Sequence, residues 1–403
     1  MERELVTLFI IAAAAFICPV IAALIPKKLI PETVFLLVAG MVLGPNVLGW
    51  AQDDLAVSLF SDLGLGFLFL LAGYEIDPRK LAGRQGRFGF LTWLVTFDLA
   101  IAITAAFPAL HSDFIEWMAV SIALTTTAFG TLIPILQDRG LFGGRLGESI
   151  LAYGTWGEIC PVIAIAIVLS TRKTWLTLAI LLAFAVIAVL AAIVPRRLWQ
   201  KGARLTGFVS RNADTNSQMT VRGVMVLLVG LVAVSALFDL DIVLGSFAAG
   251  FALRFILPGG DEGLEHKLKG IGYGFFIPLF FIVSGMGVNP AAVARDPLIL
   301  LAFVALLLAV RGLPVFVSLR LNPETRWMDG PRRATVALYC TTALPLIVAV
   351  TSIAVGAGAM SADTASVLVA AGGITVFLMP LLASLALSRM KPLPEDAAGA
   401  ESR

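Results

Sequence analysis

Residues 151–167 read Leu151-Ala-Tyr-Gly-Thr-Trp-Gly-Glu158-Ile-Cys-Pro-Val-Ile-Ala-Ile-Ala-Ile167, an apolar stretch with a single acid in its middle. Much of the chain resembles it, since 59% of the 403 residues are hydrophobic, 14% are charged and the mean hydropathy is +0.95. Soluble domains carry about 25% charged residues. A backbone in lipid must satisfy its own hydrogen bonds. The composition therefore predicts an all-α polytopic membrane protein, with residues 151–167 inside the bilayer.

The apolar segments have the length that a membrane-spanning helix needs. Runs of about 17–25 residues, separated by Gly, Pro and charged residues, predict thirteen transmembrane helices. We expect them near 5–25, 32–50, 57–76, 88–110, 114–137, 147–170, 174–195, 219–238, 241–257, 269–288, 297–320, 332–356 and 361–388. The division between 219–238 and 241–257 is marked only by Phe238-Asp-Leu-Asp241.

The placement of the basic residues predicts the orientation. Of the 29 Lys and Arg residues, 24 fall on one set of alternate connections, four on the other set, and Arg311 within a span. Because basic connections stay in the cytoplasm, we expect a cytoplasmic C-terminus and, with thirteen spans, an outer N-terminus in the cell membrane. The start of the chain lacks the basic segment of a signal peptide, and the tail 389–403 is too short to fold.

The two halves of the chain resemble each other at a nearly constant spacing. The matching pairs are 37–43 with 247–253, Gly73 with Gly285, and Thr126-Thr127 with Thr341-Thr342, at offsets of 210, 212 and 215 residues. Three matches in the same order predict two copies of a five-helix unit. An odd number of spans inverts the second copy, and inverted repeats with interrupted helices are typical of alternating-access carriers.

Three charged residues lie at mid-span: Asp98, Glu158 and Arg311. A carboxylate at the bilayer centre costs about 2.5–3.5 kcal/mol, so such residues usually bind something. Asp98 and Arg311 are 213 residues apart and occupy equivalent points of the two copies. Glu158 has no matching acid, because the repeat places Gly372-Gly373 there.

Glu158 has two interpretations. Its oxygens suit a hard cation such as Na⁺ or K⁺, and burial favours the protonated carboxyl, so one group could hold either a cation or a proton. The alternative is a static ion pair between Glu158 and Arg311. Arg311 keeps its charge and would serve as a counter-charge to an acid or to helix C-termini. Asp98 is either a residue of the ion path or a structural partner of a polar group such as Arg311.

The threonine run at 125–127 predicts an interrupted helix. Gly130 and Pro134 follow it, and Thr342 and Pro345 form the matching interruption in the second copy. Freed carbonyls and the hydroxyls of Thr126 and Thr127 would be ligands for a monovalent cation. The alternative is that these hydroxyls bond back to the backbone of a straight helix.

The sequence also excludes several classes. It has no P-loop, HExxH motif or catalytic triad, which indicates that it is not an enzyme and needs no cofactor, nucleotide or nucleic acid. Two histidines exclude a His-rich metal site, and the three cysteines lie in apolar segments without disulfide spacing. A group that holds either a cation or a proton has the chemistry of an antiporter. The alternatives are an Na⁺-coupled organic-solute symporter and a cation channel or sensor of the same fold.

Three segments carry a family resemblance. They are Ile30-Pro-Glu-Thr-Val-Phe-Leu-Leu-Val-Ala-Gly40-Met-Val-Leu-Gly-Pro45, Leu63-Gly-Leu-Gly-Phe-Leu-Phe-Leu-Leu-Ala-Gly-Tyr-Glu-Ile-Asp77 and Phe280-Phe-Ile-Val-Ser-Gly-Met286. Over roughly residues 6–388 the chain resembles the monovalent cation/proton antiporter-2 family, which comprises Na⁺/H⁺ and Kef-type K⁺/H⁺ exchangers. The resemblance implies cation/proton exchange, a role in pH homeostasis and a homodimer.

The resemblance also implies a division of the fold. Helices within 1–76 and 219–288 would form a scaffold for dimerisation, and helices within 88–170 and 297–388 an ion-carrying core. The helix at 174–195 would link the halves, and 389–403 would be a short cytoplasmic tail. In the core, the interrupted fifth and twelfth spans would cross near Glu158.

The site implied by the resemblance departs from the family pattern. The family's sixth span often carries Asp-Asp, or Gln-Asp in Kef-type proteins, where this chain has Gly157-Glu158. Only the second acid carries over, as Glu, and the basic residue of the eleventh span falls on Arg311. Gly157 adds no titrating group and Arg311 keeps its charge, so the expected exchange is electroneutral, one cation per proton. The nucleotide-binding domain of Kef-type proteins is not expected.

Overall fold

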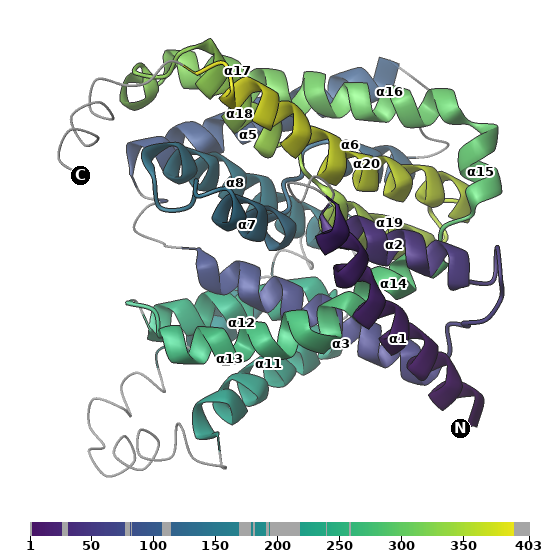
Figure 1. Ribbon diagram of the computed structural model, residues 1–403. Helices are drawn as coiled ribbons and strands as arrows, with labels where there is room; N and C mark the ends of the chain where they lie inside the picture. The colour runs from purple at the N-terminus through teal and green to yellow at the C-terminus, as the bar shows by residue number, and fades with distance from the viewer. Residues whose placement is uncertain are drawn as a thin grey trace, which may run out of the picture.

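A computed structural model describes residues 2–25, 31–76, 81, 83–106, 114–168, 179, 182–190, 193, 218–238, 240–257 and 259–390 (Figure 1). In these residues the regular structure is helical and contains no strand, which confirms the all-α fold. The helices that position the site are α5 (Arg84–Ala106), α6 (Phe114–Ala123), α7 (Phe129–Asp138), α8 (Arg145–Val168), α16 (Pro297–Leu307), α17 (Leu313–Leu321), α18 (Gly330–Tyr339), α19 (Leu344–Gly356) and α20 (Ala362–Leu387). The others are α1 (Glu2–Leu24), α2 (Glu32–Leu43), α3 (Leu55–Glu75), α11 (Met219–Leu237), α12 (Ile242–Ile256), α13 (Glu262–Ile271), α14 (Ile277–Met286) and the short α15 (Pro290–Arg295).

The described residues contain nine segments that are long and apolar enough to cross a membrane. They are Glu2–Leu24, Leu55–Glu75, Arg84–Ala106, Arg145–Val168, Met219–Leu237, Glu262–Met286, Pro297–Leu321, Gly330–Gly356 and Ala362–Leu387. The shorter apolar helices α2, α6 and α12 lie at three further predicted spans. Half of the predicted span 174–195 lies outside the described residues, and 182–190 within it is helical. The chain is thus a multi-pass membrane protein.

Aspartate caps fix where several helices begin. Asp241 accepts a hydrogen bond from the amide of Val243 at 2.8 Å and so starts α12, which confirms the predicted division after α11. Asp54 does the same for α3 through the amide of Val57 at 3.0 Å. An acceptor at this position satisfies an amide that the helix itself leaves without a partner.

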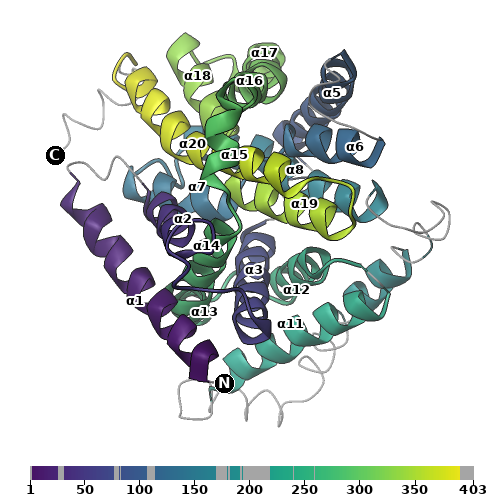
Figure 2. The ribbon, with the colours of Figure 1, turned by 90° about the vertical axis from the view of Figure 1, so that its right-hand side faces the viewer.

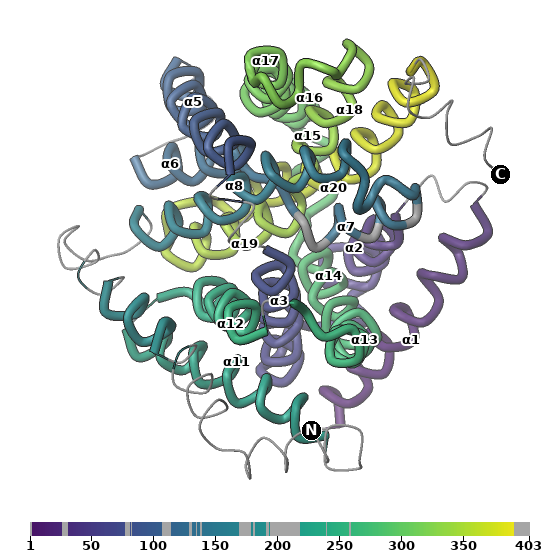
Figure 3. The backbone as a smooth tube through the Cα atoms, turned by 90° about the vertical axis from the view of Figure 1, so that its left-hand side faces the viewer, coloured from purple at the N-terminus to yellow at the C-terminus, as the bar shows by residue number. Residues whose placement is uncertain are grey.

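The helices form two groups (Figures 2 and 3). The first group contains α1, α2, α3 and α11–α14, of which α3, α11, α12 and α13 lie in the lower half of Figure 1, and the second contains α5–α8 and α16–α20. Leu70, Phe281 and Ile282 of the first group lie in one buried apolar cluster, which also extends into α8, α19 and α20, and Ile122, Phe303 and Val350 of the second group lie in another. The short helix α15 connects the groups.

The first group is held together by backbone-to-backbone packing at glycines. A Cβ atom at Gly40 of α2 would overlap the carbonyl oxygen of Ile282 in α14. One at Gly285 of α14 would overlap the carbonyl oxygen of Leu37 in α2. Only glycine allows an approach this close.

The same interface occurs a second time between α3 and α12. A Cβ at Gly250 of α12 would overlap the carbonyl oxygen of Leu70 in α3, and one at Gly73 would overlap that of Phe247. Gly250 is the repeat equivalent of Gly40, and Gly73 is the equivalent of Gly285. The two copies therefore exchange equivalent contacts, as an approximate two-fold relation requires, and the glycines that revealed the repeat are the ones that pack it.

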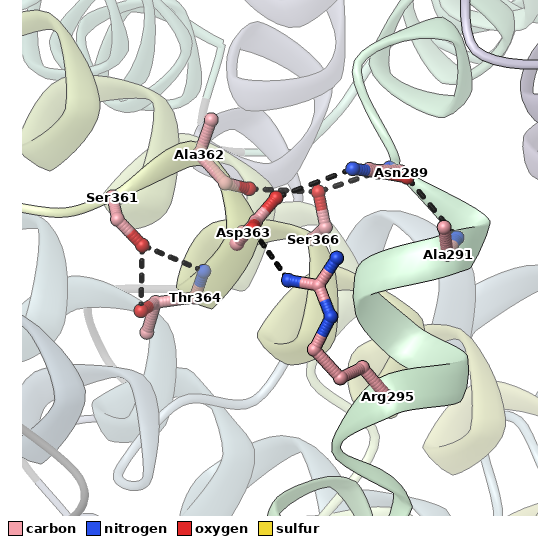
Figure 4. A network of polar contacts seen from close by, with 8 residues as sticks. All are labelled: Asn289, Ala291, Arg295, Ser361, Ala362, Asp363, Thr364 and Ser366. Atoms are coloured by element: carbon pink, nitrogen blue, oxygen red, sulfur yellow. Dashed lines mark hydrogen bonds and ion pairs between the residues drawn. The ribbon is translucent and has the colours of Figure 1, made fainter.

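Two neighbouring residues, Val288 and Asn289, are hydrogen-bonded to different helix groups. The side-chain amide of Asn46, after α2, donates to the carbonyl oxygen of Val288 at 3.1 Å. The next residue, Asn289, donates its backbone amide to Ser366 Oγ at 3.0 Å and its side-chain amide to Asp363 Oδ1 at 3.2 Å, both on α20 (Figure 4). Arg295, at the end of α15, adds an ion pair to Asp363 Oδ2 at 3.5 Å. Helix α15 is thus fastened to the second group.

Replacing Gly250 by Ala should destabilise the protein by about 1–3 kcal/mol, because the added methyl group forces two helix backbones apart. Thermal unfolding of the purified protein measures this change. Gly40→Ala should have a similar effect, since it makes the equivalent contact. Gly230→Ala in α11 is the matched control, because its Cβ would meet open space. Equal melting temperatures for Gly250→Ala and Gly230→Ala would contradict the packing argument.

Candidate functional site

Two interrupted helices cross in the middle of the second group. Helix α6 ends at Ala123 and α7 begins at Phe129, and α18 ends at Tyr339 and α19 begins at Leu344. The non-helical segments contact each other: the amide of Ala128 donates to the Thr342 carbonyl at 2.8 Å, and Thr127 Oγ1 donates to the Cys340 carbonyl at 2.5 Å. The crossed, interrupted helices expected from the sequence are therefore present.

The first interruption lies slightly earlier than its predicted residues. Gly130 and Pro134 both belong to α7, whereas the non-helical residues are 124–128. In the second interruption, Thr342 is non-helical and Pro345 occupies the first turn of α19. Proline is accepted in a first turn because its missing N–H would have no helical partner there. Pro345 therefore starts a helix.

Helix α8 supplies the acceptor that anchors the first interruption. The carbonyl of Gly157 would normally bond to the amide of residue 161, but Pro161 has no N–H. The amide of Thr127 donates to this carbonyl instead, at 2.8 Å. The crossing is thus bonded to α8 at the carbonyl of Gly157, the residue before Glu158, and this carbonyl is free because residue 161 is proline.

Glu158 is buried beside this crossing, with 2% of its surface exposed. Tyr273, which comes from the first helix group and lies in a π-helical turn, Gly272–Phe276, is near enough to Glu75 and to Glu158 to interact with both electrostatically. Sequence reasoning missed Tyr273. The signal was indirect, since Pro278 shortly after it disturbs the helical hydrogen-bond pattern.

Arg311 lies in a second π-helical turn, Leu308–Gly312, between α16 and α17. Pro314 follows it in the first turn of α17. Such turns insert one extra residue and are frequent at functional sites. The side chain of Arg311 is fully buried. The extra residue rotates the helix so that the side chain of Arg311 points toward the crossing.

The guanidinium of Arg311 binds the crossing directly. Its Nε and Nη2 atoms donate to Thr127 Oγ1 at 3.3 and 3.2 Å, and Nη2 also donates to the carbonyl of Tyr153 at 2.9 Å. Among the described residues, Nη1 has no hydrogen-bond partner. In the described part of the chain, the hydrogen bonds of Arg311 thus go to Thr127 and to the backbone of α8.

The side chains of the remaining candidates make no contact with Arg311 that the described residues show. Thr126 and Thr342 are buried, and their hydroxyls donate to carbonyls three residues earlier, those of Ala123 and Tyr339, each at 2.8 Å. The side chain of Asp98 is exposed on α5. The structure therefore brings Thr127 and Arg311 into contact, bonds Thr127 to the residue before Glu158, and leaves Asp98 outside.

Four helix ends meet at this point, which makes it suitable for a small cation. The last carbonyls of α6 and α18 lack partners within their helices and carry partial negative charge, whereas the first amides of α7 and α19 carry partial positive charge. Arg311 lies close enough to Cys340, at the end of α18, for the two side chains to interact electrostatically. The crossing thus combines backbone carbonyls with the buried positive charge of Arg311, and the buried acid Glu158 follows Gly157 on α8.

Comparison with known proteins places the whole membrane region in one family. The family model described as "Sodium/hydrogen exchanger, transmembrane" matches residues 12–388. A Bacillus subtilis protein whose name places it among the Na⁺/H⁺ antiporters is 22% identical over 401 residues, covering 94% of this chain and 62% of that protein. A Na⁺/H⁺-K⁺ antiporter of Bacillus cereus is 23% identical, covering 64% of this chain and 66% of that protein.

A solved structure has the same fold. The sodium proton antiporter of Methanocaldococcus jannaschii at pH 8 superimposes with a TM-score of 0.64 and 15% identity, covering 96% of this chain and 99% of that one. This chain spans 62% of the length of the Bacillus subtilis relative.

Thr127→Val should destabilise the protein by about 1.5–3 kcal/mol, because it removes the acceptor of a buried guanidinium and the bond to Cys340. Thr126→Val, one residue away, loses only a local bond and should cost about 1 kcal/mol or less. Thermal unfolding of both purified variants measures the difference. Equal losses in the two variants would show that Thr127 does not bridge the crossing.

Proposed function

The chain belongs to the sodium/hydrogen exchanger family, and we propose that it exchanges Na⁺ or K⁺ for H⁺ across the cell membrane by alternating access. Membership of the family confirms the resemblance found in the sequence, and the family is one of transporters. The names of the relatives support a monovalent cation and a proton as cargo. The observation that carries the proposal is Glu158, buried beside crossed helix ends.

In this proposal Glu158 is the carrier of both cargoes. A carboxylate with carbonyl oxygens around it can replace the water shell of a monovalent cation. The same carboxylate, once protonated, is neutral and has no attraction for that cation. Thr126 and Thr127, at the interruption after α6, are the proposed further ligands. The mechanism makes no use of Asp98, because its side chain is exposed.

The proposed stoichiometry is one cation per proton. Gly157 contributes no titrating group, and Arg311 keeps its charge through the cycle. The site then has the same net charge when it carries Na⁺ or K⁺ in one direction and H⁺ in the other.

The proposed movement uses the two helix groups. Helices α1–α3 and α11–α14 would form the scaffold and the homodimer contact, and α5–α8 and α16–α20 would be the moving core. The segment 174–195 would connect them. Large apolar side chains on α1, such as Phe9 and Phe16, are exposed and available for a partner subunit or lipid. The proposed orientation has the N-terminus outside and the C-terminus in the cytoplasm.

Glu158→Gln should abolish cation-driven proton movement, because the amide can neither titrate nor neutralise a cation. Proteoliposomes loaded with a pH-sensitive dye and given Na⁺, K⁺ or Li⁺ measure this. Glu158→Asp should retain exchange with altered affinity. Glu148→Gln, the same change on an exposed position of α8, is the control and should exchange normally. Normal exchange by Glu158→Gln would overturn the proposal, and cation flux without proton movement would indicate a channel.

An imposed membrane potential should leave the rate and the end point of exchange unchanged. A cycle that moved one net charge would instead gain about 2.3 kcal/mol per 100 mV, which would shift the end point visibly. Proton flux in proteoliposomes under a K⁺-valinomycin clamp, with Na⁺ as the driving cation, tests this. A voltage-dependent end point would contradict the one-to-one stoichiometry while leaving exchange itself intact.

A further inference from the structure

Asp98 is a carboxylate on the outward surface of a helix that is long and apolar enough to cross a membrane. Its side chain is exposed on α5, and the described residues offer it no hydrogen bond or ion pair. Asp98 follows Arg87, in the basic segment at the start of α5, by 11 residues, which is about 16 Å of helix. The hydrocarbon core of a bilayer is about 30 Å thick. With Arg87 at the edge of this core, Asp98 lies near its middle.

The surface around Asp98 is a continuous stripe along α5, which we call the Asp98 face. It is formed by exposed residues three or four positions apart along the helix: Leu91, Leu94, Val95, Asp98, Ala102 and Ala105. The side chains before Asp98 are large and apolar, whereas those after it are alanines. Small side chains let a second helix backbone come close inside a membrane. The face therefore combines an acid with room for a neighbouring helix beside it.

The helices of this chain cover the opposite side of α5. The neighbours of α5 are α6, α8 and α17. Thr92 Oγ1 is hydrogen-bonded to Ser318 Oγ of α17 at 2.6 Å, and the side chain of Trp93 is buried. Figures 2 and 3 show α5 at the edge of the second helix group, on the side away from the first group. In the described part of the chain, the Asp98 face is thus turned outward, where the surroundings are lipid.

Lipid by itself is a poor environment for Asp98. An ionised side chain at this depth is costly and is normally paired. A proton would remove the charge but would leave the polar atoms of the carboxyl group in hydrocarbon without hydrogen bonds. Lipid head groups lie at the bilayer surface, more than a turn of helix away. The chemistry that suits Asp98 is a basic side chain at the same depth.

A second copy of this chain does not supply that side chain. Two copies related by a two-fold axis present the same surface to each other, so Asp98 would meet Asp98 at equal depth. None of the residues that form the Asp98 face is basic. The complementary charge must therefore come from a different protein.

We propose that the Asp98 face is a docking surface for a transmembrane helix of another protein, and that this helix presents a Lys or Arg at the depth of Asp98. The ion pair neutralises both charges inside the bilayer, where a basic residue is as costly as an acid. Ala102 and Ala105 let the partner's backbone approach, and Leu91 and Val95 contact its apolar side chains. The contact lies on the second helix group and does not involve Glu158.

Photocrosslinking in the protein's own host cells tests the inference. A photoreactive amino acid at residue 102, one helical turn from Asp98, should form an adduct with a transmembrane segment of another protein. Sequencing of the adduct should find a Lys or Arg within about one turn of the attachment point. Asp98→Asn should lower the adduct about tenfold, because an interhelical polar contact is lost, and Asp98→Glu should retain it. The same photoreactive residue at Val226, 74% exposed on α11, is the control and should not give this adduct.

Reconstitution with a synthetic helix tests the charge directly. A Leu-Ala helix of about 23 residues with one central Lys should crosslink to the purified protein, and the same helix with Leu in place of Lys should not. Asp98→Lys should reverse this preference, losing the Lys helix and capturing a helix with a central Asp. Purified Asp98→Asn should exchange cations as the wild type does, because the proposed mechanism makes no use of Asp98.

Several results would overturn the inference. They are an adduct with a second copy of this chain, an adduct with lipid only, no adduct at all, or an adduct that Asp98→Asn leaves unchanged. Equal capture of the Lys and Leu helices would do the same. Loss of exchange in purified Asp98→Asn would assign this acid to the ion path instead. Exchange that survives Glu158→Gln would overturn the proposed function and leave the docking surface as it is.

Discussion

The structure depends on one constraint: inside a membrane, every polar backbone group and every charge must find its partner within the protein. Interrupting two helices at mid-membrane creates a set of such groups at one point. The chain satisfies part of this set by crossing the interruptions, so that Ala128 bonds to Thr342 and Thr127 to Gly157. Because Pro161 leaves the Gly157 carbonyl without its helical donor, the acceptor is ready where the crossing needs it. The cation-binding chemistry proposed for Glu158 uses the same unsatisfied groups.

Much of the fold could be predicted from local patterns. The lengths of the apolar runs predicted the membrane spans, because the bilayer thickness sets the length of a helix that crosses it. The glycines at 40, 73, 250 and 285 gave the repeat, because each stands where a neighbouring backbone leaves no room for a Cβ. Burial of Glu158 and Arg311 also followed, since charge at that depth is seldom turned toward lipid.

The parts that could not be predicted are contacts between distant segments. Arg311 and Thr127 are 184 residues apart, and no local pattern indicates that they bond. Arg311 and Tyr273 lie in π-helical turns, which change the direction in which a side chain points within an otherwise regular span. Asp98 and Arg311 therefore occupy equivalent positions in the repeat, but Asp98 is exposed and Arg311 is buried. The position of the first interruption was similarly set by α8, not by Gly130 or Pro134.

At the junction between Val288 and Asn289 the chain passes from a residue bonded to the first helix group to one bonded to the second, so very few torsion angles separate these two attachments. Val288 is bonded to the segment after α2, and Asn289 to the start of α20, so in the proposed movement α15 would stay with α20. In the proposed movement, a small change in these torsion angles would displace the far end of the second group most, while the glycine-packed helices of the first group would keep their positions.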